Sequence, residues 1–279
     1  MGEWPEKCFN SSLMSHQTDT RFSPGLTSDA TPRYRSVKRA LQKLIETGQY
    51  RAGGVLPSET VLAGTMQVSI GTLRRAVDEL VHEHVLVRRQ GKGTYVALHS
   101  PARFMFQFFH VEPRWSFGDD EAIHLQKPAE YPATECLSFA GGRATATQAN
   151  ALRIKAGDGV LNFENRLLLG QRVVMRDQTV VSSALFKGLT EKKFTQRAST
   201  IYSLYQTGFG ITVLRTLERA RTVAADTTSA KMLGVSAGAP VMEIHRLALT
   251  FGDRPVEYRV STLNTAAHDY VNASPMPAA

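Results

Sequence analysis

Two adjacent arginines, Arg74 and Arg75, stand near the start of a predicted helix in the N-terminal third of the 279-residue chain. At 100° per residue, the apolar residues of this stretch gather on one side of the helix and both arginines lie on the other. Because arginine presents a rigid fork of donors, exposed arginines at this place can pair with a guanine edge or a phosphate of DNA. Alternatively, the two are ordinary solvated helix residues.

Two serines predict where short helices begin around these arginines. Ser58 and Ser69 are good N-cap residues, and Glu59 suits the positive end of a helix dipole. We expect helices over residues 34–47, 58–65 and 69–84. An apolar run, a Gly-Lys-Gly tip and a second apolar run follow between residues 85 and 98, which is typical of a β-hairpin. Three helices and a basic hairpin predict a winged helix-turn-helix, whose third helix enters a DNA major groove.

The charge distribution agrees with this interpretation. The whole chain carries a formal net charge of +8 at pH 7. Residues 31–99 hold 11 Lys and Arg against 5 Asp and Glu, a net +6. Such a concentration is the footprint of a nucleic-acid-binding module, although a solvated basic face is a competing explanation. The capped helices, exposed arginines and basic hairpin all fall within these residues, and together they favour DNA binding.

The sequence lacks the residue patterns of several other kinds of functional site. The Gly91–Thr94 turn does not have the upstream glycine or the strand-to-helix context of a phosphate-binding loop. The histidines at 82 and 84 lack the i, i+4 spacing of a zinc helix, and Cys8 and Cys136 are too few for a metal cluster or a disulfide framework. No apolar run reaches membrane-spanning length. We therefore expect a cytoplasmic protein without metal, cofactor or membrane contact.

Composition and pattern divide the chain into five segments. Residues 1–30 are rich in Ser, Thr, Asp and Pro and predict a disordered tail, within which Met14 is an alternative start of translation. The further segments are a DNA-binding domain at 31–98, a linker at 99–102, an effector and dimerisation domain at 103–272, and a short tail at 273–279. The linker near Leu98 is expected to act as the hinge.

The second half predicts a mixed α+β sheet domain. We expect strands at 160–169, 173–181, 212–223, 241–250 and 256–263, and a helix at 199–207. The stretches "LRIKAGDGV" and "LGVSAGAPV" resemble each other and suggest two similar half-units. The predicted strands offer a polar pocket with Arg166, Arg172, Arg176, Glu257, Arg259 and Ser261, of which we expect Arg166, Arg176, Glu257 and Ser261 to bind the effector. Several strand arginines, Arg172 and Arg259 above all, can instead form cross-strand surface ion pairs. No nucleophile elbow, metal spacing or phosphate loop appears in residues 100–279.

The N-terminal residues resemble the GntR family of bacterial winged-helix regulators. The similarity runs from Tyr34 to Val96 and includes Leu56-Pro57-Ser58-Glu59, Val68-Ser69, Thr72-Leu73-Arg74 and Gly91-Lys92-Gly93-Thr94-Tyr95-Val96. By this resemblance Ser69, Thr72 and Arg74 match the DNA-contacting motif, and Gln90, Gly91 and Lys92 match the wing tip. The family usually has Arg where this chain has Ile70, so the operator sequence should differ, with Arg75 as a candidate for compensation.

The C-terminal residues resemble the UTRA effector domain of the HutC subfamily, most clearly from Ser199 to Leu263. This resemblance implies a fold similar to chorismate lyase, beginning near Arg103. It also implies that Arg166 and Glu257 help to bind the effector. Because arginine forks bind carboxylate or phosphate, an anionic metabolite is expected. The family often has Pro at the position of Arg172 and Glu at that of Arg176, which favours a more acidic ligand here or turns Arg176 away.

Taken together, the sequence predicts a metabolite-responsive transcriptional repressor. A homodimer would place two recognition helices on a pseudo-palindromic double-stranded operator, which effector binding would release. Two alternatives remain at this point. An enzyme with an appended DNA-binding head would need a catalytic constellation in the second half, and an architectural DNA-binding protein would need no effector pocket.

Overall fold

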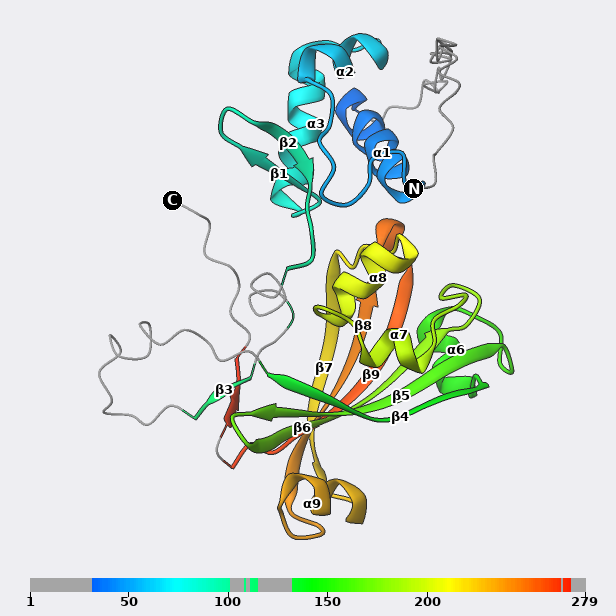
Figure 1. The fold of residues 1–279 in the computed structure, drawn as a ribbon, viewed down its shortest axis with the longest axis vertical. Coiled ribbons are helices and arrows are strands. Elements are labelled where there is room, and N and C mark those ends of the chain that lie inside the picture. The colour runs from blue at the N-terminus through cyan, green and yellow to red at the C-terminus, as the bar shows by residue number, and fades with distance from the viewer. Residues whose placement is uncertain (1–31, 101–107, 109–110, 115–131, 267, 272–279) are drawn as a thin grey trace, which may run out of the picture.

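The computed structural model describes residues 32–100, 108, 111–114, 132–266 and 268–271. The predicted tails at 1–30 and 273–279, Met14, the second half of the predicted linker and the start of the effector domain at Arg103 lie outside this range. The described part forms an N-terminal head and a C-terminal sheet domain, so the predicted fold class is confirmed (Figure 1).

The head contains three helices and a two-stranded wing. These elements are α1 (Arg33–Glu46), α2 (Glu59–Thr65), α3 (Ile70–His82), β1 (Leu86–Arg89) and β2 (Gly93–Val96). Ser58 Oγ accepts a hydrogen bond from Val61 N at 3.3 Å and caps α2, and Ser69 caps α3 in the same way. One apolar cluster joins the helices to the wing, with Leu41, Leu73 and Leu80 fully buried. The predicted helices and hairpin are confirmed.

The second domain is built on a six-stranded antiparallel sheet in the order β4-β5-β6-β9-β8-β7. The strands are β4 (Ala133–Arg143), β5 (Gly159–Leu169), β6 (Arg172–Ser182), β7 (Arg215–Ala224), β8 (Pro240–Leu249) and β9 (Pro255–Leu263). The sequence predicted all of these except β4, an edge strand that is exposed along most of its length and carries a Gly-Gly pair. A short pair, β3 (Val111–Pro113) with β10 (His268–Tyr270), forms a separate two-stranded sheet.

The sheet domain repeats one unit twice, as the two similar stretches suggested. Helix α6 (Ala146–Leu152) connects β4 to the β5-β6 hairpin, and α9 (Thr227–Leu233) connects β7 to the β8-β9 hairpin. Each helix ends on a residue with positive φ, Arg153 in the first unit and Gly234 in the second. The two units meet where β6 pairs with β9 at the centre of the sheet.

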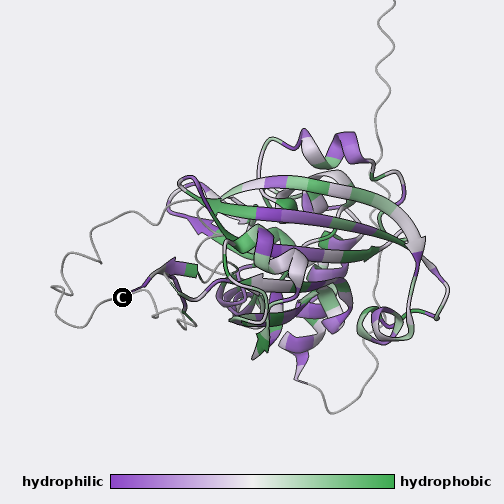
Figure 2. Ribbon diagram, turned by 90° about the horizontal axis from the view of Figure 1, so that it is seen from below, coloured by the Kyte–Doolittle hydropathy of each residue, from purple (hydrophilic) through white to green (hydrophobic). Residues whose placement is uncertain are grey.

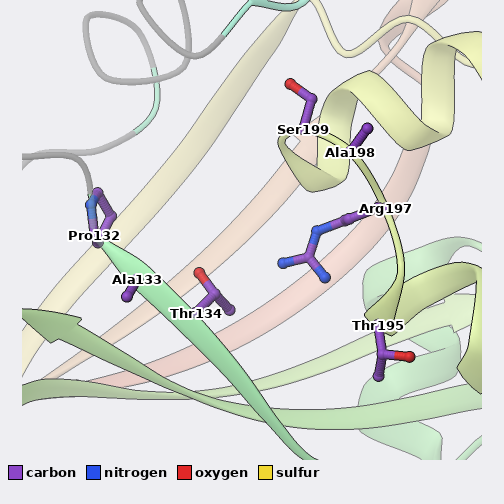
Figure 3. A pocket seen from close by; sticks show the side chains of 7 residues that line it. All are labelled: Pro132, Ala133, Thr134, Thr195, Arg197, Ala198 and Ser199. Carbon is purple, nitrogen blue, oxygen red and sulfur yellow. The ribbon is translucent and has the colours of Figure 1, made fainter.

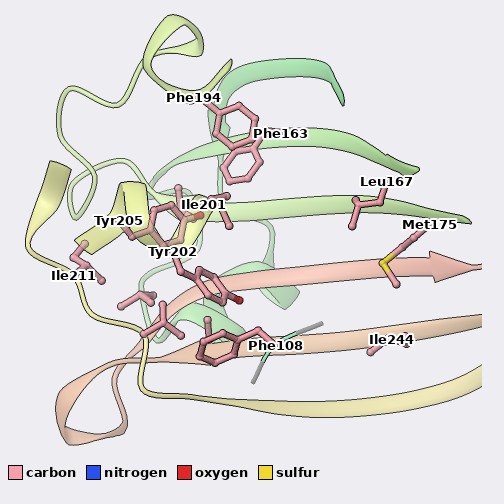
Figure 4. Packing of buried hydrophobic residues seen from close by; sticks show 14 of the residues in the cluster. Phe108, Phe163, Leu167, Met175, Phe194, Ile201, Tyr202, Tyr205, Ile211 and Ile244 are labelled. Atoms are coloured by element: carbon pink, nitrogen blue, oxygen red, sulfur yellow. The ribbon is translucent and has the colours of Figure 1, made fainter. Parts of the chain in front are cut away.

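Helices cover both faces of the sheet, and strands β5 and β6 contribute different residues to the apolar clusters beneath these helices. Helices α7 (Glu191–Thr195) and α8 (Ile201–Phe209) pack on one face, which we call the α8 face (Figure 4). Its core contains Phe163 and Leu263. Helix α6 packs against Val160 and Val180 on the opposite face, the α6 face. Figure 2 shows hydrophilic and hydrophobic residues alternating along the strands, as a sheet with two different faces requires.

The head contacts the sheet domain through the linker and through the turn between β8 and β9. Gln206 on α8 donates to Ala97 O and accepts from His99 N, each at 2.9 Å. Phe251, in the 3-10 turn Phe251–Asp253, is buried in the apolar cluster of the head. Arg254 beside it lies 3.5 Å from Glu46 of α1.

Candidate DNA-reading surface and effector site

The first turn of α3 presents small polar and apolar groups to solvent. Ser69 Oγ accepts from Thr72 N at 3.1 Å and lies 2.9 Å from Thr72 Oγ1, so the two predicted contact residues also form the helix cap. Ile70 is the first helical residue and is 43% exposed. An exposed helix start of this kind also leaves free backbone N–H groups that suit an anion such as a DNA phosphate.

Arg74 takes part in an exposed ionic network across α2, α3 and the wing. Its Nε lies 2.9 Å from Glu59 Oε2, and Arg88 Nη2 lies 2.9 Å from the other oxygen of the same carboxylate. Arg88 also pairs with Asp78. The Arg74 side chain is 61% exposed, so this pair can exchange its partner for DNA at little cost.

Arg75 points in a different direction from Arg74. Its guanidinium lies over the ring of Tyr34, 4.1 Å from the ring centre, on the side of α1. On the same side Lys38 bridges Glu79 at 2.8 Å and Glu83 at 2.6 Å. The side chains of Arg74 and Arg75 therefore lie on different sides of α3. For Arg75 to replace the arginine that the family usually has at position 70, its guanidinium would have to move away from the Tyr34 ring.

The predicted wing-tip residues, Gln90, Gly91 and Lys92, are all exposed in the turn between β1 and β2. Gly91 has φ 68°, a left-handed conformation that glycine adopts without strain. Lys92 N donates to Arg89 O at 2.9 Å and Lys92 O accepts from Tyr95 at 2.9 Å, so the turn is held from within. The Lys92 ammonium thus stands on a well-defined tip.

The four residues predicted to bind an effector do not form one pocket. Arg166 and Arg176 are direct partners in the β5-β6 register and lie on the α6 face. Arg166 pairs with Glu135 at 2.6 Å at the surface, and Arg176 pairs with Glu164 at 2.6 Å. Glu257 and Ser261 project from the α8 face, because alternate residues of a strand point to opposite sides of the sheet. A single pocket lined by all four is thus excluded in this conformation.

Glu257 and Ser261 belong instead to a buried ionic cluster with Asp177 and Arg259. Arg259 bridges Asp177 at 3.1 Å and Glu257 at 2.9 Å, and Ser261 Oγ donates to Asp177 at 2.5 Å. Arg259 was predicted to form a surface ion pair. It does form an ion pair, but the cluster is buried: Glu257 is completely inaccessible and Asp177 is 1% exposed.

Two tyrosines of α8 complete this buried ionic cluster. Tyr205 OH donates to Glu257 Oε2 at 2.7 Å and Tyr202 OH to Oε1 at 3.2 Å. Burial raises the pKa of both phenols, and the neighbouring Glu257 raises it further, so both remain protonated donors. Although burial opposes a charge on Arg259, Glu257 and Asp177 raise its pKa well above the ordinary value. Asp177, Tyr202 and Tyr205 were missed in the sequence, where only their helix and strand periodicity is visible.

Two hollows share part of their lining, and the smaller one adjoins the buried ionic cluster. A small one of about 30 Å³ is lined by Thr134, Asn165, Leu167, Asp177, Arg197, Ile201 and Arg259. A surface pocket of about 320 Å³ shares Thr134 and Arg197 with it and opens between β4 and the loop before α8 (Figure 3). Figure 3 shows the Arg197 guanidinium pointing from that loop into the pocket toward Thr134. Sequence reasoning missed Arg197, since it lies in a loop with no periodic pattern.

The floor of these hollows contains polar atoms that can bind a ligand. Asn165 is 5% exposed, and its Oδ1 has no hydrogen-bond partner within the described part of the chain. The Arg197 guanidinium donates to Phe194 O at 2.6 Å and lies 4.7 Å from the centre of the Phe194 ring, which orients it at the mouth. The arrangement can bind an anionic group at Arg197 and hydrogen-bonding groups at Asn165.

The described residues contain no group of three or more His, Cys, Asp or Glu placed to hold a metal ion. None of the helices among them is long and apolar enough to cross a membrane.

Comparison with known proteins places both domains. Residues 33–96 match the family of bacterial regulatory proteins called gntR, and residues 130–269 match the UTRA domain. The chain is 25% identical over 224 residues to an Escherichia coli K12 protein named "Probable fructoselysine utilization operon transcriptional repressor", covering 80% of this chain and 86% of that one. It is 33% identical over 145 residues to the histidine utilization repressor of Klebsiella aerogenes, covering 50% and 56%.

A solved structure agrees with this assignment. The ligand-binding domain of a GntR-family transcriptional regulator from Bordetella bronchiseptica superimposes with a TM-score of 0.52 at 28% identity, over 60% of this chain and 96% of that domain. With the two domain matches, this shows that the chain belongs to the GntR family of transcriptional regulators and carries a UTRA domain behind its DNA-binding head.

Proposed function

We propose that this protein is a repressor that binds its operator through α3 and the wing and releases it when a small anionic metabolite enters the hollows on the α8 face. The observation that carries the proposal is the joint presence of an exposed, ion-paired Arg74 and a buried polar floor around Asn165. The proposed role is regulatory, without catalysis, in the cytoplasm.

On the DNA side, the exposed network supports exchange of ion-pair partners. Arg74 is held by Glu59 in the free protein, and a guanine edge or a phosphate offers a comparable acceptor. Ser69 and Thr72 flank it at the helix start, and Lys92 projects from the wing tip. A homodimer would place two such surfaces on the two half-sites of a pseudo-palindrome.

On the effector side, Arg197 gives a binding point for a carboxylate or a phosphate. Asn165 and Asp177, deeper in the hollow, suit hydroxyl or amino groups. The E. coli and Klebsiella relatives are named for the utilization of fructoselysine and of histidine. Both molecules combine a carboxylate with an amino group, and such a ligand matches the mixed charge of this site.

Helix α8 links the effector site to the head. Tyr202 and Tyr205 bond Glu257 from one side of the helix. The next residue, Gln206, bonds the backbone of Ala97, at the end of the head, and of His99, at the start of the linker. A ligand that displaces α8 would therefore act on the linker directly. Reciprocal coupling of a few kcal/mol, typically ~1–3, is enough to weaken operator binding 5- to 150-fold.

The test is thermal stabilisation of the purified protein by a panel of sugar phosphates, sugar acids, amino acids and small carboxylates. Arg197→Ala is the test variant and Arg166→Ala the matched control, since Arg166 lies on the opposite face of the sheet. We expect one anion to raise the melting temperature of wild type and Arg166→Ala but not of Arg197→Ala. Loss of the response in Arg166→Ala alone would refute the placement of the site.

The coupling is tested with the ligand found in that panel and the operator in a DNA-binding titration. Gln206→Ala should bind the ligand as the wild type does, because Gln206 does not line either hollow. The ligand should nevertheless change its operator affinity less than that of the wild type. An unchanged ligand effect would show that the signal bypasses the linker contact.

A further inference from the structure

The first helical residue of α3 is an exposed isoleucine. Ile70 follows the Ser69 cap directly and is 43% exposed, whereas the apolar residues of the same helix at Leu73, Ala76 and Val77 are at most 1% exposed. Single exposed apolar residues are common on protein surfaces. The position of this one sets it apart, because it lies at the N-terminal end of the helix that binds DNA in the proposed function.

Ile70 and Arg74 are four residues apart and therefore neighbours on the surface of α3. A helix of a helix-turn-helix contacts base edges with its N-terminal residues. Ile70 thus stands where a side chain meets a base edge, beside an arginine that can take a guanine. A branched apolar side chain has no donor or acceptor to offer to a polar base edge.

The major groove offers one apolar group, the C5-methyl of thymine. We propose that Ile70 is a specificity-determining residue that packs against a thymine methyl in each half-site of the operator. Polar base edges at this position would be disfavoured. Ile70 would shield their donors and acceptors from water and offer no hydrogen bonds in place of those to water. The inference rests on the proposed function of α3 and adds to it the base class that α3 selects.

The experiment begins with the full-length protein and a random pool of double-stranded DNA. Binding sites selected by the wild type are expected to contain one invariant thymine per half-site. Each thymine of the best site is then replaced by uracil, which removes the 5-methyl and leaves the hydrogen-bonding edge unchanged. At one position per half-site, uracil should weaken wild-type binding about fourfold, the effect of one methyl group taken from water.

Variants of Ile70 separate a methyl contact from other effects of uracil. Ile70→Ala should bind the thymine and uracil sites equally, and Ile70→Val should keep part of the discrimination. Val61→Ala is the matched control: Val61 is an exposed apolar residue of α2, 57% exposed, and its loss should leave the full uracil effect. Melting temperatures of the variants are expected to equal that of the wild type because both side chains are exposed.

The possible outcomes distinguish this inference from the function on which it rests. If no sequence is selected, or if Arg74→Ala selects the same sequence with the same affinity, the reading of DNA by α3 itself fails. If a site is selected and depends on Arg74, but uracil has no effect at any position, Ile70 does not read a methyl. Full uracil discrimination in Ile70→Ala would also overturn the inference.

Discussion

The head and the sheet domain both contain arginines shared between two carboxylates, yet the two clusters differ in exposure. In the head, Arg88 joins Glu59 and Asp78 at the surface, with 42% of its side chain exposed. In the sheet domain, Arg259 joins Asp177 and Glu257 with 7% of its side chain exposed. The exposed pairs contribute little to stability and can change partner, whereas the buried group depends on every member for charge balance.

This difference matches what the proposed function requires of each region. A DNA-reading surface must release its arginines to a new partner without unfolding, and exposed pairs permit this. The floor of a ligand site must keep polar groups in place while the ligand enters and leaves, and buried, fully bonded pairs provide that rigidity. Similar arginine–carboxylate clusters are therefore exposed where ion pairs must exchange partners and buried where polar groups must stay in place.

The largest effect should follow from breaking the buried group. Arg259→Ala leaves Asp177 and Glu257 as two buried carboxylates without their cation, and we expect a loss of about 3–5 kcal/mol in the free energy of unfolding. Urea denaturation measures the loss, and Arg166→Ala, an exposed arginine on the other sheet face, should cost less than about 1 kcal/mol. Equal losses in both variants would remove the distinction between buried and exposed clusters.

The head could be predicted closely from the sequence. Its helices show the 3.6-residue apolar period, serines stand at the starts of α2 and α3, and the Gly-Lys-Gly tip marks the turn of the wing. Each of these signals is local. What the sequence did not show is the side of α3 to which each arginine turns, because the Tyr34 ring that holds Arg75 comes from another helix.

The sheet domain could be predicted only in part, for a physical reason. Its strands are visible, but β5 and β6 carry polar residues on both faces, so alternation does not reveal which face is covered. A bulge in the β5-β6 pairing between Leu167 and Leu168 interrupts the alternation. In an unbroken strand Arg172 and Arg176 would lie on the same face of the sheet, because they are four residues apart. The bulge shifts the register between them, so this simple alternation does not hold. The polar residues of the covered face, Asn165 and Asp177, were overlooked for this reason.

The second prediction concerns the two arginines of α3 in their proposed contact with DNA. Arg74→Ala should weaken binding to the operator by about 1–3 kcal/mol and leave non-specific binding largely unchanged. Arg75→Ala should change sequence preference less, since its guanidinium lies over Tyr34. Titrations of operator and random DNA with both variants measure this. Equal losses on both DNAs would contradict base reading by Arg74.

The third prediction concerns the buried tyrosines at high pH. Because burial raises the pKa of Tyr202 and Tyr205 in the folded state, the unfolded chain loses these protons first as the pH rises. Their contribution to stability is complete below about pH 10 and is lost above it, by about 1.4 kcal/mol per pH unit for each tyrosine. Urea denaturation at several pH values between 8 and 11 gives the free energy of unfolding at each pH. Above about pH 10 this free energy should fall less steeply with pH for Tyr202→Phe than for the wild type. An identical pH dependence would mean that Tyr202 ionises in the folded protein.

The smallest effect on stability is expected at Glu59, where the exposed network meets. Glu59→Gln removes the shared partner of Arg74 and Arg88 and one favourable charge from the first turn of α2, so stability should fall by less than about 1 kcal/mol. DNA affinity at low salt should instead rise, because the Arg74 guanidinium loses its carboxylate partner and Arg88 keeps only Asp78. Glu83→Gln removes an equal charge, but from Lys38 on the side of α1. Operator affinity should therefore rise more for Glu59→Gln than for Glu83→Gln. If operator affinity rises equally in the two variants, it depends only on the net charge of the head. The ion pairs of Glu59 would then have no specific role in DNA binding.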